Sequence, residues 1–185
     1  VVTNSCGTSV TKIINIISPP AISLSIVASN PTVCAGNSTT LSTTVNGGTP
    51  SYFFNWNTGA NTSSIIVTPT VSTVSNYTVT VADAAGCVVT KSISITVNPI
   101  PSITVTPNNP TICAGKTTTV NLSGALNFTT NPGNITASTF TLSPTVTTVY
   151  SITGASPFGC IGSRIDSIKV VNTPTISSGV NSNTV

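Results

Sequence analysis

The sequence predicts an all-β fold made of tandem β-sandwich domains joined by short Pro-containing linkers, and three observations support this prediction. Residues 30–36 (NPTVCAG) return almost unchanged as residues 109–115 (NPTICAG), 79 positions later. Segments rich in Ile, Val, Thr and Tyr alternate apolar with polar residues, the period expected of half-buried strands, and no segment has apolar residues at helical spacing. A period of about 80 residues is the size of a small β-sandwich.

The first complete repeat is expected to span residues 19–98 and to contain six strands. Turns rich in Asn and Gly at residues 46–50 and 57–61 separate several of these strands, because Asn and Gly tolerate positive φ. The expected strands are residues 22–26, 38–45, 52–56, 63–67, 76–82 and 88–97.

The second repeat is expected to span residues 99–172, after a linker at residues 98–101 (NPIP) whose two prolines hold the backbone extended. Its strands are expected at residues 102–106, 117–123, 126–129, 139–142, 149–153 and 164–171.

Two partial repeats are expected to flank these domains. Residues 1–18 parallel residues 86–98, so they are interpreted as the final strand of a preceding repeat. Residues 173–185 are interpreted as the first strand of a following one.

Composition excludes several classes of partner. Charged residues make up 4% of the chain, against roughly 25% in ordinary soluble domains, so Ser, Thr and Asn must keep the surface hydrated. The five cations are scattered and form no cluster that could neutralise a run of phosphates, which argues against nucleic acid and anionic membranes as partners. No apolar run approaches the ~20 residues of a membrane-spanning helix, so no membrane insertion is expected. The scattered cations are Lys12, Lys91, Lys116, Arg164 and Lys169.

The five cysteines indicate an oxidising, extracellular location and a disulfide framework. Each repeat contains one cysteine near its start and one near its end, so the sequence predicts disulfides Cys34–Cys87 and Cys113–Cys160, located in loops. Cys6 occupies the position of Cys87, and its partner is expected outside the unit, upstream in the same chain or in another subunit. Metal binding is the alternative, but the chain has no histidine and no Cys-x-x-Cys motif.

The large aromatic residues are interpreted mainly as core. Trp56, Tyr77 and Tyr150 are expected to be buried, because large aromatic side chains contribute most by burial. If Trp56 points inward, strand alternation turns Phe53 outward. An exposed Phe53 is the candidate contact surface, for stacking on a sugar or for packing against another subunit.

No catalytic or cofactor site is predicted. The two carboxylates, Asp83 and Asp166, occupy non-equivalent places in their repeats. Without histidine there is no Ser-His-Asp arrangement, and one carboxylate per domain does not supply the pair used in glycoside hydrolysis or a calcium site. The expectation is therefore a protein that is not an enzyme, with no metal and no cofactor.

The Pro-Thr-Val/Ile-Cys-Ala-Gly segments, together with residues 55–60 (NWNTGA), 76–83 (NYTVTVAD) and the Gly86-Cys87 pair, resemble the Ig-like and PKD-like repeats of giant secreted surface proteins of Bacteroidota. The resemblance covers essentially the whole chain and implies export by the type IX system. It also implies service as adhesins, gliding-associated filaments or spacers beside enzyme domains. In this group Asp-Ser/Thr-apolar segments are O-glycosylated, which makes Ser167 a candidate site. The second repeat departs from the pattern because it lacks the Trp-x-x-Gly segment.

The leading functional hypothesis is an extracellular, structural protein: tandem Ig-like repeats that form a rod, filament or adhesin stalk on the cell surface. Its expected partners are copies of itself or adjoining repeats, joined end to end through strand addition at open sheet edges. The alternative is a carbohydrate-binding or spacer module of a secreted polysaccharide-degrading enzyme, with surface glycans as partners.

Overall fold

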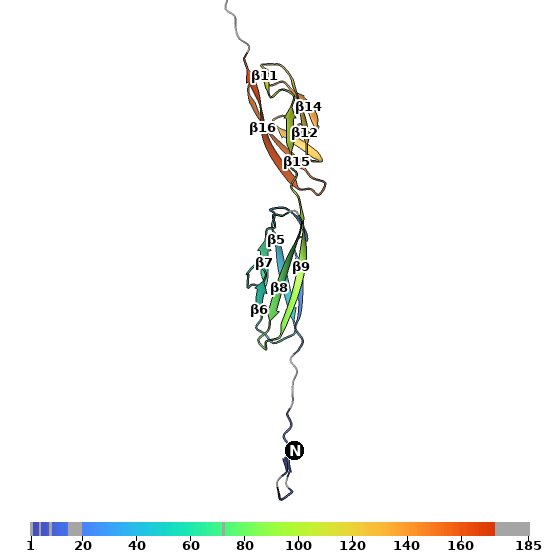
Figure 1. The fold of residues 1–185 in the computed structure, drawn as a ribbon, viewed down its shortest axis with the longest axis vertical. Helices are drawn as coiled ribbons and strands as arrows, with labels where there is room; N and C mark the ends of the chain where they lie inside the picture. The colour runs from blue at the N-terminus through green and yellow to red at the C-terminus, as the bar shows by residue number, and fades with distance from the viewer. Residues whose placement is uncertain (1, 4, 8, 15–19, 72, 173–185) are drawn as a thin grey trace, which may run out of the picture. The chain divides into compact units, whose positions relative to one another are not determined.

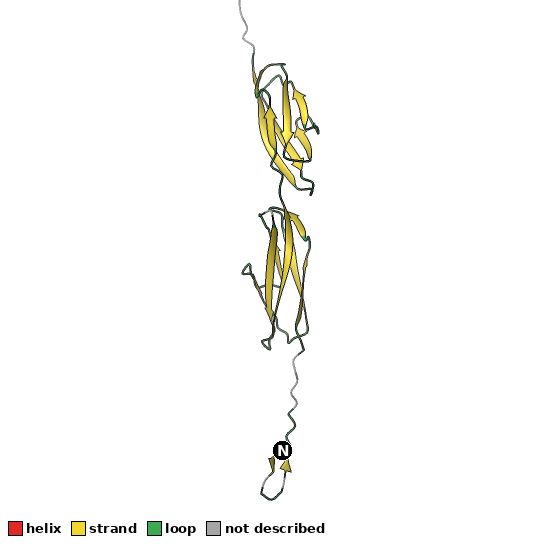
Figure 2. Ribbon diagram, turned by 45° about the vertical axis from the view of Figure 1, so that its right-hand side comes forward, coloured by secondary structure: helices red, strands yellow, loops and turns green. Residues whose placement is uncertain are grey.

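A computed structural model of the chain describes residues 2–3, 5–7, 9–14, 20–71 and 73–172. Every regular element in this part of the chain is a β-strand (Figures 1 and 2). In the described residues there is accordingly no helix that could cross a membrane. The prediction of an all-β fold is confirmed.

The strands between residues 23 and 98 form two sheets. A three-stranded sheet has the order β3-β5-β7, and a four-stranded sheet has the order β4-β9-β8-β6. The strands are β3 (Ser23–Ala28), β4 (Thr32–Cys34), β5 (Thr39–Asn46), β6 (Phe53–Trp56), β7 (Ser64–Val67), β8 (Val74–Ala82) and β9 (Val88–Asn98).

The strands between residues 104 and 171 repeat this topology. A three-stranded sheet has the order β10-β12-β14, and a four-stranded sheet has the order β11-β16-β15-β13. The strands are β10 (Thr104–Pro107), β11 (Thr111–Cys113), β12 (Thr118–Ser123), β13 (Asn127–Asn131), β14 (Thr139–Leu142), β15 (Thr148–Ala155) and β16 (Ile161–Val171). In strand letters both sets are ABE and A′GFC, the arrangement of an Ig-like sandwich.

Two three-residue strands, β4 and β11, were missed by the sequence reading. Each lies between a proline and a Cys-Ala-Gly turn, too short for alternation to reveal it. β11 runs parallel to the end of β16, with Cys113 opposite Val171. The prediction that the first cysteine of each repeat lies in a loop was therefore wrong: Cys34 and Cys113 end strands.

By contacts within the chain, the described residues divide into two units. Unit 1 contains the residues up to Pro31 together with Ser38–Thr68 and Val74–Thr96. Unit 2 contains Thr32–Asn37, Pro69–Thr73 and the residues from Val97 onward. The two units therefore do not coincide with the two sequence repeats, since the first Cys-Ala-Gly turn belongs to unit 2. The repeat boundaries drawn from the sequence remain a prediction.

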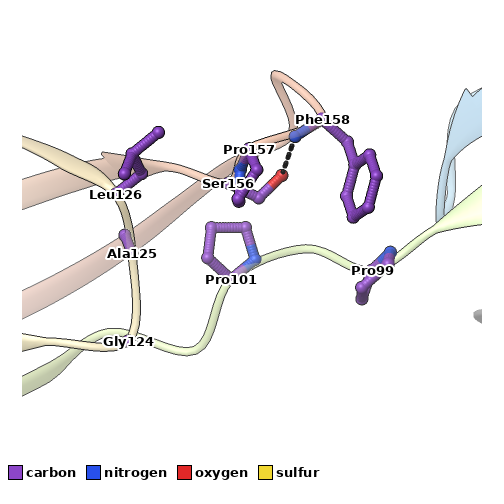
Figure 3. Close-up of a pocket in the computed structure, with 8 residues that line it drawn as sticks. All are labelled: Pro99, Pro101, Gly124, Ala125, Leu126, Ser156, Pro157 and Phe158. Atoms are coloured by element: carbon purple, nitrogen blue, oxygen red, sulfur yellow. Dashed lines mark hydrogen bonds between the residues drawn. The ribbon is translucent and has the colours of Figure 1, made fainter.

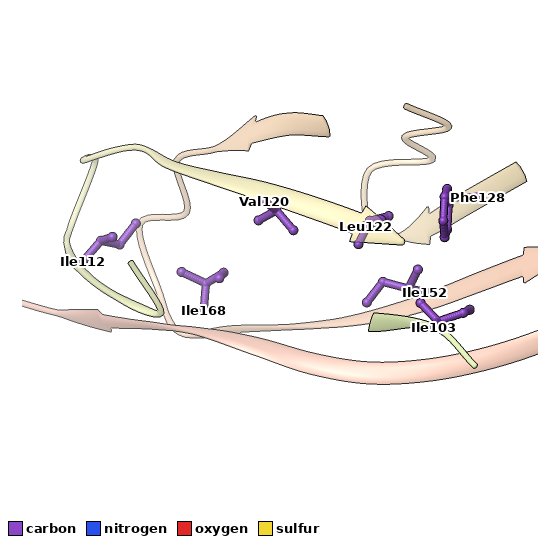
Figure 4. Close-up of a cluster of buried hydrophobic side chains, with 7 residues drawn as sticks. All are labelled: Ile103, Ile112, Val120, Leu122, Phe128, Ile152 and Ile168. Atoms are coloured by element: carbon purple, nitrogen blue, oxygen red, sulfur yellow. The ribbon is translucent and has the colours of Figure 1, made fainter. Parts of the chain in front are cut away.

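The core of each unit follows strand alternation. In unit 1 the inward positions of β5 to β9 are buried, and they are Leu41, Trp56, Ile65, Val67, Val79, Val81 and Ile95. In unit 2 seven buried apolar side chains from β11, β12, β13, β15, β16 and the segment before β10 form one cluster (Figure 4), and they are Ile103, Ile112, Val120, Leu122, Phe128, Ile152 and Ile168. Burial of these side chains, at ~25 cal/mol per Å² of apolar surface, is the main stabilising term in each sandwich.

The outer face of β8 and β9 explains how a chain with so few charges keeps a hydrated surface. Cross-strand hydroxyl pairs cover it: the Thr78 and Ser92 side-chain oxygens lie 2.8 Å apart, and those of Thr80 and Thr90 lie 3.0 Å apart. Such pairs stabilise neighbouring strands while presenting polar groups to water.

The flanking segments are described only in part. β1 (Val2–Thr3) and β2 (Ser9–Val10) pair as a short antiparallel hairpin, with exposed Cys6 in the turn between them. The predicted strand over residues 173–185 lies outside the described residues, as do residues 15–18 of the predicted first segment.

Candidate functional site: the Cys34–Cys160 disulfide and its turns

The disulfide joins Cys34 to Cys160, 126 positions apart, with 5.6 Å between the two Cα atoms. Cys34 ends β4, and Cys160 lies in the turn before β16 and is fully buried. Both cysteines belong to unit 2, although Cys34 lies in the first sequence repeat. The predicted pairs Cys34–Cys87 and Cys113–Cys160 were wrong, and within the described residues Cys87 and Cys113 are free thiols.

The length of the G strand explains why the predicted pairs do not form. The Ala35 N–H donates to the Asn98 carbonyl at 2.9 Å, so Cys34 lies beside the end of β9, whereas Cys87 precedes its first residue. An 11-residue strand spans roughly 33 Å, and a disulfide needs its Cα atoms within about 7 Å of each other. The same strand length separates Cys113, opposite the end of β16, from Cys160 before its start.

The turn after each first cysteine shares two backbone hydrogen bonds between the repeats, although the Gly36 N–H also donates to the Pro69 carbonyl in the first one. The Asn37 N–H donates to the Cys34 carbonyl at 2.9 Å, and the Lys116 N–H donates to the Cys113 carbonyl at 3.0 Å. The Ala114 N–H donates to the Val171 carbonyl, which corresponds to the bond between Ala35 and Asn98. The two Cys-Ala-Gly turns are therefore structurally equivalent.

The turns before the G strands, here called the F–G turns (residues 83–87 and 156–160), are equivalent too. The Asp83 N–H donates to the Cys87 carbonyl at 3.0 Å, and the Ser156 N–H donates to the Cys160 carbonyl at 2.8 Å. The side chain of the first residue in each turn also accepts a hydrogen bond from the N–H of the cysteine. Cys87 donates to the Asp83 carboxylate, and Cys160 donates to the Ser156 hydroxyl. A carboxylate in one turn and a hydroxyl in the other perform the same structural task.

Asp83 is buried and holds its turn through three charge-assisted hydrogen bonds. The backbone N–H groups of Thr49, Ala85 and Cys87 donate to its carboxylate at 2.8, 3.0 and 2.8 Å. The hydrogen bond from Thr49 is the main cause that lowers the pKa of Asp83 below its usual value, against the opposing effect of burial. Close beside it, Gly48 has positive φ, and a Cβ there would meet the carboxylate.

This lowered pKa predicts an acid-sensitive unit 1. A carboxylate whose folded pKa lies below its unfolded value stabilises the fold above about pH 4, and this stability is lost as pH falls through the folded pKa. We expect the thermal midpoint of unit 1 to fall between pH 5 and pH 2 in the wild type. In Asp83→Ser, which copies Ser156, the midpoint should be lower at pH 7 and should change less with acid. Equal acid sensitivity in both proteins would contradict this role for Asp83.

An apolar hollow of about 440 Å³ lies in unit 2 next to the second F–G turn. Figure 3 shows Pro101 near Pro157 and the Phe158 ring near Pro99, with the Phe158 N–H donating to the Ser156 hydroxyl at 3.3 Å. Phe158 is 65% exposed. The sequence reading missed this hollow, although the prolines of the linker and the replacement of Ala85 by Phe158 in the second F–G turn were available signals. The lining residues are Pro99, Pro101, Gly124, Ala125, Leu126, Ser156, Pro157 and Phe158.

Phe53 lies where the sequence predicted, on the outer face of β6, and is 66% exposed. It pairs with Ala82, which pairs with the exposed Val88, so the three residues form an apolar row across the sheet. The following rows on this face carry Asn, Ser and Thr. The corresponding row of unit 2 contains Asn127, Ala155 and Ile161.

The predicted core aromatics are buried to different degrees. Trp56 is 2% exposed, and its indole N–H donates to the Thr62 carbonyl at 2.8 Å. Tyr77 and Tyr150 are half-buried. Burial raises the pKa of the Tyr150 hydroxyl above its usual value.

The remaining candidate residues of the chain are Asp166 and Ser167. Within the described residues there is no group of three His, Cys, Asp or Glu side chains that could bind a metal ion. Asp166 accepts a hydrogen bond from the N–H of Ser167 at 2.8 Å, and Ser167 is exposed on β16.

Comparison with known proteins gives likeness of fold only. No protein-family model and no curated protein sequence matches the chain. Among solved structures it is similar to the ICAM-5 D1–D4 ectodomain fragment, at 14% identity and a TM-score of 0.48, covering 83% of this chain and 47% of that one. It is also similar to the eight N-terminal Ig domains of Down Syndrome Cell Adhesion Molecule, at 15% identity and a TM-score of 0.45, covering 83% of this chain and 25% of that one. A third similarity is to three N-terminal domains of the bacteriophage RB49 Hoc capsid protein, at 18% identity and a TM-score of 0.40, covering 81% of this chain and 59% of that one.

The chain covers less than two thirds of the length of each of these three solved structures. What its own strand order establishes is the fold class: each set of seven strands, β3 to β9 and β10 to β16, is an Ig-like β-sandwich.

Proposed function

We propose that this chain is a structural, extracellular module whose tandem Ig-like repeats form a rod, filament or adhesin stalk on the cell surface. The observation that carries the proposal is the disulfide between Cys34 of the first sequence repeat and Cys160 of the second. The bond lies within unit 2 and ties the Cys-Ala-Gly turn of the first repeat covalently to the F–G turn of the second, which suits a load-bearing element. Because disulfides persist in oxidising compartments, the bond also supports secretion.

The polar groups of the chain support a role outside catalysis. Three backbone N–H groups donate to the Asp83 carboxylate, and the half-buried Asp166 on β16 accepts a hydrogen bond from the N–H of Ser167. Hydroxyl pairs such as Thr78 with Ser92 satisfy each other across strands. These contacts stabilise turns and sheets, and we propose that the chain acts without enzymatic activity, metal or cofactor.

Small-angle X-ray scattering of the chain in solution tests the rod. We expect the oxidised protein to scatter as a single stiff particle. Reduction of the Cys34–Cys160 bond should give a broader, flexible ensemble, and Cys160→Ser should behave like the reduced protein under both conditions. Scattering that is already flexible with the disulfide intact would contradict a stiff element.

One observation favours a second candidate function, a carbohydrate-binding module. Phe53 is an exposed aromatic ring beside rows of Asn, Ser and Thr side chains, the combination of stacking surface and hydrogen-bonding groups that sugars use. Against it, the row that contains Phe53 continues with Ala82 and Val88, so the face offers a single ring rather than a row of rings.

Replacement of Phe53 distinguishes these uses. We expect Phe53→Ala to leave the free energy of unfolding within about 0.5 kcal/mol of wild type, because the ring is exposed. It should weaken self-association measured by analytical ultracentrifugation if the row packs against another subunit, or glycan retention in affinity electrophoresis if it binds sugar. Val88→Ala, in the same row, should reproduce only the first effect. Unchanged association and unchanged glycan retention would remove Phe53 as a contact surface.

The resemblance to surface repeats of Bacteroidota supports two further proposals. The first is that the parent protein belongs to that group of secreted proteins. The second is that Ser167 carries an O-linked glycan, since it is exposed and follows Asp166. Intact mass spectrometry of native material should show a mass above that of the polypeptide, and this excess should localise to the peptide that contains Ser167. A mass equal to the polypeptide would end the glycan proposal.

A further inference from the structure

We propose that Cys113 forms a disulfide with Cys87 of a second copy of this chain, so that copies join head to tail through the same kind of bond that joins Cys34 to Cys160. The inference rests on the proposed structural function, and it names the residues that would join the repeats of one copy to those of another. Two equivalences between bonded and free cysteines carry it.

Cys113 is equivalent to the bonded Cys34. Both occur in seven-residue segments that differ at one position and lie 79 positions apart, and both end a three-residue strand, β11 and β4. Two backbone hydrogen bonds match. The N–H groups of Ala35 and Ala114 donate to the carbonyls of Asn98 and Val171, and those of Asn37 and Lys116 donate to the carbonyls of Cys34 and Cys113. Cys34 is half-buried in its disulfide, whereas the Cys113 thiol is exposed.

Cys87 is equivalent to the bonded Cys160. Each is the last residue of an F–G turn and directly precedes a G strand, β9 or β16. The N–H of each cysteine donates to the side chain of the residue four positions earlier, Asp83 or Ser156. Cys160 is fully buried in its disulfide, while Cys87 is a half-buried free thiol.

The bond that forms within the chain therefore has a direction. It joins the cysteine that ends the A′ strand of one repeat, Cys34, to the F–G cysteine of the following repeat, Cys160. Cys113 is a free cysteine at the end of an A′ strand, and Cys87 is a free cysteine of an F–G turn. Each copy of the chain therefore carries both kinds of cysteine that a further bond requires. A contact between unlike ends is heterologous, and it produces open chains unless the rotation between copies closes a ring.

The chemistry is thiol–disulfide exchange with a low-molecular-weight disulfide, RSSR, as oxidant. The Cys113 thiolate attacks one sulfur of RSSR, which forms a mixed disulfide and releases RS⁻. The Cys87 thiolate of the second copy then attacks the Cys113 sulfur and releases the second RS⁻. Two protein thiols are oxidised to one disulfide, RSSR is reduced to two RSH, and the two thiol protons balance the two RS⁻.

Complementary cysteine variants test the proposal. All proteins carry Cys6→Ser, so that Cys6 takes no part, and each is incubated concentrated in a buffer of oxidised and reduced glutathione. The parent should give a ladder of covalent multimers on non-reducing gels. Neither Cys87→Ser nor Cys113→Ser should form covalent dimers alone, but an equal mixture of the two should form dimers and no higher species.

Peptide mapping identifies the bond in the dimer from the mixture. Trypsin cuts after Lys12, Lys91, Lys116 and Arg164, so Cys113 lies in peptide 92–116, and Cys87 lies with Cys34 in peptide 13–91. We expect a three-peptide species in which 92–116 is joined to 13–91, which is itself joined to 117–164. Dimers from either single variant alone, a mixture without dimers, or 92–116 joined directly to 117–164 would each overturn the proposal. The scattering result for the monomer would stand in all three cases, so the two proposals fail separately.

Discussion

Replacing Cys160 with serine should lower the free energy of unfolding of unit 2 by up to about 4 kcal/mol. The disulfide closes a loop of more than one hundred residues, and in the chain-entropy model such a cross-link destabilises the unfolded chain by about 5 kcal/mol. Unit 1 occupies much of that loop and shortens its flexible part when folded, so 4 kcal/mol is the upper figure. For a domain whose whole stability is about 5–15 kcal/mol, the loss is large.

Cys113→Ser is the matched control for this prediction. It changes the same residue type at the position equivalent to Cys34, but it removes a free thiol, so stability should stay within about 0.5 kcal/mol of wild type. Denaturation monitored by hydrogen exchange of β15 and β16 reports unit 2 separately. A reductant should lower the free energy of unfolding of wild-type unit 2 to that of Cys160→Ser, and it should leave the stability of that variant unchanged. Equal losses in Cys113→Ser and Cys160→Ser would instead indicate a bond between those two cysteines.

Replacing Trp56 with alanine should destabilise unit 1 by about 3–5 kcal/mol, the usual cost of removing a large aromatic side chain from a core. Trp56 is almost completely buried on β6, opposite the fully buried Val79 of β8. The change also leaves the Thr62 carbonyl without its hydrogen bond from the indole N–H. Hydrogen exchange of β8, which pairs with β6, measures the effect without needing the fluorescence of the lost tryptophan.

Phe53→Ala is the control within the same strand. Phe53 lies three positions before Trp56 and points to the opposite face, so its truncation should leave the protection of β8 nearly unchanged. Comparable losses in both variants would mean that β6 does not have the alternation described here. The exchange of unit 2 amides in β15 should be unaffected by either change, because Trp56 and Phe53 both belong to unit 1.

The sequence predicted most strands because the period of two is a local signal. For example, Ser64–Val67 and Thr139–Leu142 were predicted to within one residue. The disulfide could not be predicted in the same way, because it depends on which end of each G strand a cysteine occupies. The repeat suggested pairing within a unit of about 80 residues, but β4 was too short to detect, and it places Cys34 beside the end of β9 rather than near Cys87.

The second C strand shows a similar limit. The missing Trp-x-x-Gly segment left β13 without its expected core residue, yet the strand forms over Asn127–Asn131. By register, Thr130 takes the place of Trp56 and is fully buried. Its hydroxyl accepts a hydrogen bond from the Ile135 N–H at 3.1 Å. The Thr130 side chain therefore satisfies a backbone donor of the following loop, where Trp56 fills core volume with an aromatic ring. Such a compensation depends on a contact that strand periodicity does not encode.

Non-reducing peptide mapping of the monomeric chain tests the central claim, that one disulfide joins consecutive repeats. Trypsin separates the alternatives, because Cys34 and Cys87 share peptide 13–91, Cys113 lies in 92–116 and Cys160 lies in 117–164. The structure predicts that 13–91 is joined to 117–164 and that 92–116 carries a free thiol. A bridge closed inside 13–91, together with 92–116 joined to 117–164, would contradict it.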